Sequence, residues 1–329
     1  MPVDSPPRPS VHNGLTLHLK DLIRLRHHIT ALEMGSRKKV DSLLSGHEQS
    51  PFKGRGMDFE EVRRYQPGDD IRHMDWRVTA RSGNPHLKVF REERQRSVFL
   101  IVDFSSSMLF GTRVALKSVI AAQAASLLAW ASTKHGNRIG GDVFSNDYHR
   151  DVKPQGGHPG TLRFLHMLVD VHEHATPAET GQSPAPFSHA LERVVRTARP
   201  GSLIFVLTDF PRLDRQIESS LKYLSAHHDV MTISITDPLE QEPPLSGQYR
   251  ISDGTQFFDL DTTSHTWREA YRDRFQHRQK TYKNFCQHAG IGVLRLTTDA
   301  SVPQALRDEL RKLSQHKHQH LWGHRSLNA

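Results

Sequence analysis

Three oxygen-bearing side chains follow one apolar stretch of the sequence at a spacing of two residues. Asp103, Ser105 and Ser107 come directly after residues 98–102, an apolar run that is typical of a fully buried strand. Alternate residues of an extended segment point to the same side, so we expect the carboxylate and the two hydroxyls to lie together beyond the end of this strand. Hard oxygen donors suit Mg²⁺. The stretch therefore predicts a magnesium site, with Mn²⁺ or Ca²⁺ as alternatives.

A second carboxylate follows another apolar run. Asp209 comes after residues 203–207 and Thr208. In a parallel sheet the carboxyl ends of two such strands meet at one edge, which is where α/β proteins bind their ligands. We therefore expect Asp209 to join Asp103 at this edge. The alternative for Asp103 is a structural role, as a turn carboxylate or as the N-cap of a helix.

The rest of the sequence alternates between strand-like and helix-like patterns, which predicts a doubly wound, mostly parallel α/β sheet. The expected strands are residues 98–103, 203–207, 230–235 and 291–296. The expected helices are residues 15–32, 114–134, 161–171, 188–198, 213–227, 267–289 and 303–313. Two hairpins are expected as well, one from residues 138–144 and 148–153 and one within residues 247–261.

The segment before the first strand lacks helical periodicity and carries turn signals at residues 53–56, 66–69 and 82–85. We expect a small β-rich subdomain here, with a hairpin formed by residues 76–80 and 87–90 and with Trp76 mostly buried. The chain then divides into four parts. These are a Pro-rich tail with an N-terminal helix (1–44), the β-rich subdomain (45–96), the main α/β domain (97–315) and a His-rich tail (316–329).

Composition narrows the class of protein. The 329 residues are 36% hydrophobic and 24% charged, and no apolar run approaches the roughly 18 residues that a membrane-spanning helix needs. The first ten residues lack the apolar centre of a secretory signal. A single cysteine, Cys286, excludes an internal disulfide and suits a reducing compartment. We therefore expect a cytoplasmic protein without a membrane span.

The net charge of +8 has two interpretations. It favours acidic partners such as nucleic acid or an anionic membrane surface, or it is simply a solvated basic surface. The lysines and arginines are spread widely, without the interleaved aromatic residues that single-strand binders use. The solvated surface is therefore favoured, and no stable nucleic-acid partner is expected.

The sequence resembles a known family in two places. Residues 103–107, Asp-Phe-Ser-Ser-Ser, resemble the DxSxS metal-ion-dependent adhesion site of von Willebrand factor A domains. Residues 54–93 resemble the signature of the DUF58 family, whose core is similar to such a domain. The resemblance implies that Asp209 joins the metal site through water. It also implies a threonine ligand from a loop, for which Thr161 is the candidate, the alternative being a helix N-cap.

The family resemblance also implies a function. DUF58 proteins are commonly encoded beside MoxR-type AAA+ ATPases. The expected function is therefore that of a non-enzymatic, metal-dependent interaction module, which works with such an ATPase in the assembly or maturation of an unknown client protein.

The block of residues 54–93 is rich in alternating charges, and arginine suits such a block because its planar fork binds carboxylates bidentately. Arg72, Asp75, Trp76 and Arg81 are the candidate partner-binding residues. The alternative is a polar network that only braces the subdomain against the main domain. Further along, Asp237-Pro238 closes the strand at 230–235 and predicts a turn.

The motifs favour binding over catalysis. Phosphatases of the haloacid dehalogenase type carry a second aspartate where Ser105 stands here, so a general acid is missing at that spacing. The sequence contains no GxSxG elbow, Walker A loop or HExxH helix. Two alternatives stay open, a metal-dependent phosphoester hydrolase that uses the same residues and a basic nucleic-acid-binding protein.

Overall fold

The computed structural model describes residues 14–29, 57–66, 71, 74–92, 95–175, 185–209, 213–252 and 257–316. The Pro-rich start, Arg72, the turn signals at 53–56 and 67–69 and the tail beyond residue 316 lie outside these ranges. The chain forms two compact units. One contains residues 46–95, and the other contains residues 1–45 and 96–329.

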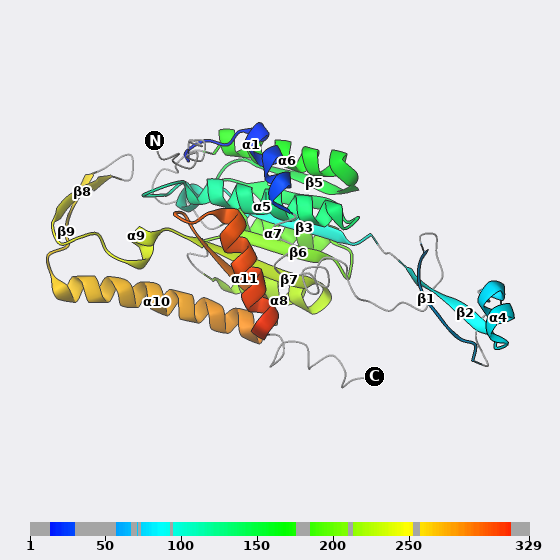
Figure 1. The fold of residues 1–329 in the computed structure, drawn as a ribbon. Coiled ribbons are helices and arrows are strands. Elements are labelled where there is room, and N and C mark those ends of the chain that lie inside the picture. Colours follow the sequence, from blue (N-terminus) through cyan, green and yellow to red (C-terminus); the bar gives the residue numbers. More distant parts are fainter. Residues whose placement is uncertain are drawn as a thin grey trace, which may run out of the picture. The chain divides into compact units, whose positions relative to one another are not determined.

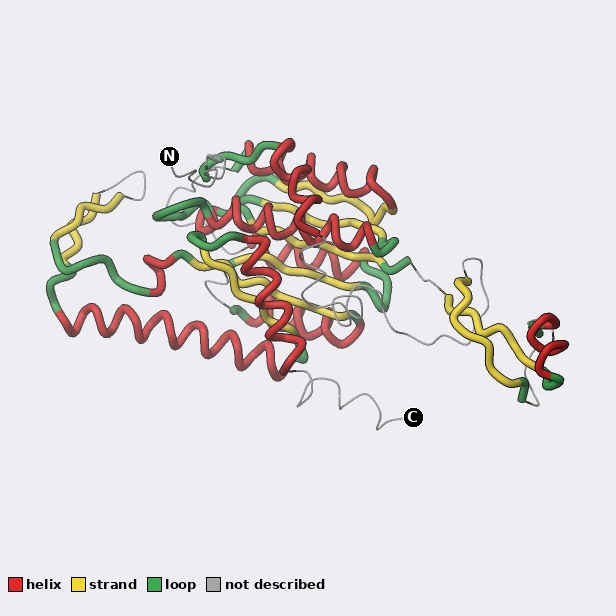
Figure 2. Tube along the Cα trace, in the orientation of Figure 1, coloured by secondary structure: helices red, strands yellow, loops and turns green. Residues whose placement is uncertain are grey.

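The larger unit is built on a six-stranded sheet, shown in Figures 1 and 2. Its strands are β3 (Ser97–Asp103), β4 (Arg138–Phe144), β5 (His149–Gly156), β6 (Leu203–Thr208), β7 (Asp229–Thr236) and β10 (Gly292–Thr297). They lie in the order β10-β7-β6-β3-β4-β5, and every neighbouring pair is parallel except β4 and β5. The predicted doubly wound, mostly parallel α/β fold is therefore confirmed, as is the hairpin that β4 and β5 form.

The strand order reverses at β3. The chain first moves outward through β4 and β5 on one side, then returns to place β6, β7 and β10 on the other side. Such a reversal leaves a crevice between the two connections that diverge from the central strands. Asp103 ends β3 and Thr208 ends β6 at this crevice.

Helices cover both faces of the sheet (Figure 1). They are α1 (Leu19–Arg24), α5 (Lys117–Lys134), α6 (Gly157–Glu173), α7 (Ala185–Thr197), α8 (Arg215–His227), α10 (His265–His288) and α11 (Val302–His316). Apolar residues of α1, α5, α6 and α11 pack in one core cluster. Those of α7, α8 and the end of α10 pack in the other, which includes the buried Cys286. None of the helices in the described ranges has the length and apolarity to cross a membrane.

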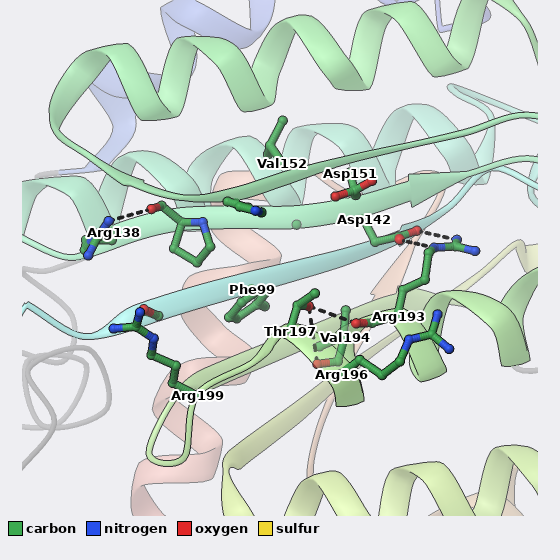
Figure 3. Close-up of a pocket in the computed structure, with 14 residues that line it drawn as sticks. Phe99, Arg138, Asp142, Asp151, Val152, Arg193, Val194, Arg196, Thr197 and Arg199 are labelled. Atoms are coloured by element: carbon green, nitrogen blue, oxygen red, sulfur yellow. Dashed lines mark hydrogen bonds and ion pairs between the residues drawn. The ribbon is translucent and has the colours of Figure 1, made fainter.

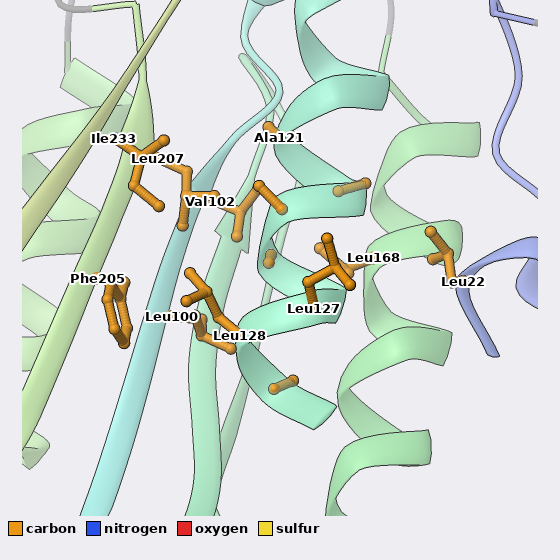
Figure 4. Packing of buried hydrophobic residues seen from close by; sticks show 14 of the residues in the cluster. Leu22, Leu100, Val102, Ala121, Leu127, Leu128, Leu168, Phe205, Leu207 and Ile233 are labelled. Carbon is orange, nitrogen blue, oxygen red and sulfur yellow. The ribbon is translucent and has the colours of Figure 1, made fainter. Parts of the chain in front are cut away.

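The central helix of the first face is α5. It is buried on all sides from Lys117 to Ser132 except at Gln123, because it lies between the sheet and the outer helices α6 and α11. Figure 4 shows Leu100 of β3 beside Leu128 of α5, with Leu127 on the opposite side of that helix beside Leu168 of α6. Helices that are apolar around their whole circumference are typical of such an inner position.

The N-terminal helix is shorter than predicted. The chain forms α1 and then a 3-10 turn at Leu25–His28, whereas the apolar pattern predicted one helix over residues 15–32. Trp130 of α5 donates a hydrogen bond from Nε1 to the carbonyl of Leu22, at 3.2 Å. The polar hairpin predicted within residues 247–261 is confirmed, and its strands are β8 (Gln248–Ser252) and β9 (Phe257–Asp261).

The smaller unit contains β structure, but its predicted hairpin is wrong. Residues 76–82 form helix α4 (Trp76–Ser82), and β2 (His86–Glu92) pairs with β1 (Met57–Arg64) instead. Asp75 starts the helix by accepting hydrogen bonds from the backbone of Arg77 and Val78, at 3.0 and 3.1 Å. Gly83, with φ of 69°, ends it. Trp76 was predicted to be mostly buried and is 67% exposed, so that prediction is also wrong.

Gly141 of β4 lies where the sheet leaves no room for a side chain. A Cβ added there would stand 2.4 Å from the carbonyl oxygen of Leu100 and 2.7 Å from the ring of Phe164. We expect Gly141→Ala to lower the free energy of unfolding by about 2 kcal/mol or more, because the strand or the ring must shift.

The matched control is Gly292→Ala on β10, where a new Cβ would make ordinary contacts of 3.4 Å with Met231. This variant should change the free energy of unfolding by less than about 1 kcal/mol. Urea denaturation measures both variants. Equal stabilities would show that β4 tolerates a larger separation from β3.

Candidate functional site

The end of β3 carries a buried carboxylate that joins two strands. Asp103 is 4% exposed. Its Oδ1 accepts the backbone N–H of Ser105 at 2.8 Å, and its Oδ2 accepts the hydroxyl of Thr208 at 2.7 Å. The first bond turns the chain out of the strand and the second ties β3 to β6. Asp103 thus fills the predicted turn role and also faces the crevice.

The two predicted hydroxyls lie beside this carboxylate. The turn that Asp103 forms leads into a 3-10 helix at Ser106–Met108. At the start of this helix the Oγ atoms of Ser105, which precedes it, and Ser107 are 3.4 Å apart. Ser107 also lines a cavity of about 170 Å³ together with Asp209. The structure therefore brings Asp103, Ser105, Ser107 and Asp209 to one edge of the sheet.

A buried lysine accompanies Asp209. Lys117 is 1% exposed, and its Nζ donates to Oδ2 of Asp209 and to Oε1 of Glu240, both at 2.7 Å. Burial acts to lower the pKa of Lys117, but the two carboxylates outweigh it and raise the pKa above its usual value. Lys117 is therefore a fixed cation at the first turn of α5.

Glu240 reaches this position through a short helix after β7. Asp237 caps α9 (Pro238–Gln241), and Glu240 Oε2 accepts the backbone N–H of Asp237 at 2.9 Å. The Asp237 carboxylate accepts hydroxyls of Thr112 and Thr298, at 2.6 and 2.5 Å. Burial acts to raise the pKa of Asp237, but these hydrogen bonds outweigh it and the pKa lies below its usual value. Asp237 is thus occupied by its structural bonds, and Glu240 faces the site.

The charges at this edge are not balanced. Burial raises the pKa of Asp103 from 3.8 to about 6, and the Asp209 carboxylate adds to the effect, while hydrogen bonds from Ser105 and Thr208 oppose it. With all three carboxylates ionised and Lys117 protonated, these four groups carry a net charge of −2, and Arg278 on the wall of the cavity beside Asp209 offsets part of it. Among the described residues, Asp103 forms no ion pair, and Lys117 pairs with Asp209 and Glu240 instead.

The donor set fits a divalent cation. Oδ1 of Asp209 is buried and accepts no hydrogen bond in the part of the chain that the structure describes. Among the described residues no three histidine, cysteine or acidic side chains gather in a metal-binding cluster, so the serine hydroxyls would have to complete the set. Carboxylate and hydroxyl oxygens together are suitable ligands for Mg²⁺, and a cation would reduce the excess of negative charge.

Thr161 does not join this group. It is fully buried in α6, and its hydroxyl hydrogen-bonds the hydroxyl of Thr133, near the end of α5. Because α5 begins at the site with Lys117 and rises about 1.5 Å per residue, Thr133 lies about 24 Å further along the helix. The prediction of Thr161 as a ligand is wrong, since the turn before α6 lies at the opposite edge of the sheet. Thr161 is not an N-cap either, because α6 begins at Gly157.

Sequence reasoning missed Lys117 and Glu240. The sequence signal for Lys117 is a single lysine at the start of a helix whose following residues are mostly apolar or small. If such a lysine is buried, its charge needs a buried acidic partner. Glu240 could not be recognised as a site residue, because a glutamate at the third position of a helix is already explained by a capping box. Helix α10 adds Arg278 and Tyr282 to the cavity wall, and nothing in their local sequence distinguishes them.

The candidate partner-binding residues lie in the smaller unit. Trp76 and Arg81 are exposed, whereas Asp75 is 9% exposed and serves as the cap of α4. Arg72 lies outside the described residues. A docking role for this surface stays a prediction.

The fold and this edge define a doubly wound α/β protein with a polar site at its switch point. Residues 61–282 match the model of the family described as "Protein of unknown function DUF58", and the chain belongs to that family. Uncharacterized proteins of Mycobacterium tuberculosis and Mycobacterium bovis are 29% identical over 229 residues, which cover 68% of this chain and 69% of theirs.

Solved structures with partial similarity are also known. The conserved hypothetical protein BatB from Bacteroides thetaiotaomicron is 17% identical with a TM-score of 0.41, over 67% of this chain and 99% of that chain. A von Willebrand factor type A protein from Catenulispora acidiphila is 12% identical with a TM-score of 0.38, over 68% of this chain and 42% of that chain.

Asp103→Asn should stabilise the metal-free protein above pH 6. The pKa of Asp103 is raised to about 6, so ionisation of the native carboxyl costs on the order of 3 kcal/mol, which asparagine avoids. The native state binds more protons than the unfolded chain between pH 3.8 and about 6. Wild-type stability therefore falls as the pH rises through this window, and the advantage of the variant vanishes below it.

The measurement is urea denaturation in EDTA across this pH range, with the exposed Asp273→Asn of α10 as the control of equal charge change. The control should show no comparable gain. A variant that is less stable than wild type at every pH would mean that the Asp103 charge itself holds β3 and β6 together.

Lys117→Met should be strongly destabilising, since it leaves Asp209 and Glu240 without their shared cation. Breaking a buried ion pair by removing one partner costs about 3–5 kcal/mol. The control is Lys222→Met on α8, whose 60%-exposed side chain pairs with Glu218 at 3.7 Å; an exposed pair contributes about 1 kcal/mol or less. Thermal and urea unfolding compare the two, and similar losses would contradict the assigned role of Lys117.

Proposed function

We propose that this protein is a non-enzymatic interaction module that docks a partner protein through a divalent metal ion. Asp103, Ser105, Ser107 and Asp209 would hold Mg²⁺, together with water. The observation that carries the proposal is the buried Oδ1 of Asp209, which has no hydrogen-bond partner among the described residues and lies near a carboxylate whose pKa is raised to about 6. Such an edge attracts a cation strongly.

The surrounding residues support docking of an acidic side chain. When bound, the ion would supply an electrophilic position that accepts a partner's carboxylate oxygen. The cavity of about 170 Å³ beside Asp209 has the guanidinium of Arg278 on its wall, which suits the second oxygen of the same carboxylate. Lys117 orients Asp209 and Thr208 orients Asp103, each through a hydrogen bond of 2.7 Å. The two carboxylate ligands are therefore held in place before a partner binds.

The proposal favours binding over hydrolysis. Among the described residues no histidine lies within hydrogen-bond distance of Ser105 or Ser107, so neither hydroxyl has a general base of that kind. Ser118 does contact His172 at 3.2 Å. However, Ser118 is fully buried in α5 and burial lowers the pKa of His172 to about 4. That pair has no access to a substrate.

Family membership supports the choice of partner. Because DUF58 proteins are commonly encoded beside MoxR-type AAA+ ATPases, we propose such an ATPase as the docking partner. The pair would act in the assembly or maturation of a client protein. A cytoplasmic location follows from this partnership and is part of the same proposal.

A binding titration against the co-encoded ATPase tests the proposal. Wild type should bind in Mg²⁺ and lose most of its affinity in EDTA, and Asp103→Ala should be weak in both. The matched control is Ser106→Ala, because Ser106 lies between the two proposed serine ligands and contacts Asn146 only through its backbone N–H. Removing the hydroxyl of Ser106 should leave the metal dependence unchanged.

A calorimetric titration of Mg²⁺ into the protein alone separates the two steps. Saturable binding that Asp103→Ala removes would support the metal site even if the ATPase is not the partner. Equal partner affinity with Mg²⁺ and with EDTA, in wild type and in Asp103→Ala, would refute metal-mediated docking and make the surface around Trp76 the leading interface.

A further inference from the structure

A larger cavity lies on the face of the sheet that α7 covers, away from the site described above. It has a volume of about 480 Å³ and opens between α7 and the strands β3, β4 and β5 (Figure 3). Its wall includes Phe99 from β3, Pro154 from β5 and Val194 from α7. Phe99 stands four residues before Asp103, which places it about 13 Å along the strand. The two sites are therefore separate.

One ion pair gives this cavity a fixed wall. Asp142 of β4 is 1% exposed, and its two carboxylate oxygens accept hydrogen bonds from Nε and an Nη atom of Arg193, at 2.6 and 2.8 Å. Figure 3 shows this bidentate pair joining the strand to α7. The charge of Arg193 is thereby neutralised by Asp142, and its side chain is held against the sheet.

The remaining charges around the cavity are mostly positive. Arg138, Lys153, Arg196 and Arg199 line it and are exposed, and Asp151 is the further acidic residue. In the described part of the chain Lys153, Arg196 and Arg199 form no ion pair, and Arg138 donates to the carbonyl of Pro154 at 3.0 Å. The cavity thus has an excess of three positive charges. Like charges gathered in this way repel one another unless an anion compensates them.

We propose that this cavity binds a phosphate-bearing organic anion of about nucleotide size. The volume lies within the roughly 300–1,000 Å³ of small-ligand pockets. Figure 3 shows Arg196 and Arg199 at opposite ends of the cavity, and each guanidinium by itself suits a phosphate because its planar fork donates bidentately. The flat body of such a molecule would lie against Pro154 and against the small exposed parts of Phe99 and Val194, which are 3% and 2% exposed. The inference does not depend on the proposed metal site.

Calorimetry of the full chain in EDTA tests this proposal, with pyrophosphate as the probe of the charged part and ADP as the probe of the whole ligand. ADP should bind more tightly than pyrophosphate, because its organic body adds apolar contact. Arg196→Gln/Arg199→Gln should weaken both by about tenfold or more, because the phosphates lose at least one charge-assisted bond whichever end of the cavity they occupy. Arg274→Gln/Lys280→Gln, which removes two exposed charges of α10, should bind within about twofold of wild type.

Several outcomes would overturn the proposal. One is the absence of pyrophosphate binding at millimolar concentrations in a folded wild-type protein. Another is an equal loss in the two double variants, which would show a general charge effect. A third is displacement of ADP by a poly-glutamate peptide that binds more tightly than ADP, which would identify an acidic polypeptide as the occupant.

Discussion

A buried ammonium group between two carboxylates organises the carboxyl edge of the sheet. Lys117, Asp209 and Glu240 come from α5, from the end of β6 and from the short helix after β7. A charge in so dry a position is tolerated only when it is paired and hydrogen-bonded. The hydrogen-bonded ion pairs of Lys117 therefore hold the three elements together, and they fix the position of Asp209 at the crevice.

The doubly wound topology explains why polar side chains gather at this edge of the sheet. Two apolar clusters bury both faces of the sheet, so the charged groups of the described site gather at strand ends, beyond the apolar layers. At the reversal of strand order the ends of β3 and β6 lie side by side. Asp103 and Asp209 are then brought together at a buried edge, where burial raises the pKa of Asp103 and the Asp209 carboxylate adds to the effect. The excess of negative charge at this edge is thus a consequence of the fold.

The protein separates charge of opposite sign between two places. The crevice at the carboxyl edge has an excess of negative charge that one lysine does not balance. The cavity beside α7 has an excess of positive charge because Asp142 is already used by Arg193. The net charge of +8 gives no indication of this arrangement, because it is a sum over the whole chain, in which the charges of the crevice and of the cavity partly cancel. A cation at one place and an anion at the other would complement them independently.

The sequence by itself determined the strand and helix order, and with it the edge at which Asp103, Ser105, Ser107 and Asp209 meet. It could do so because buried strands are continuous apolar runs, and because spacing along one segment decides which side chains share a side. Family membership was likewise visible in the linear motif, and the matched region confirms it.

Only the tertiary structure decided what surrounds these residues. Lys117 and Glu240 are more than a hundred residues apart in the sequence, and Thr161 was assigned to the site although its turn lies at the other edge of the sheet. Trp76 was expected to be buried in a hairpin, but the Asp75 cap and Gly83 made a helix of that segment. In each case a contact across the fold, or a local cap that competes with strand pairing, decided the outcome. Periodicity carries no information about either.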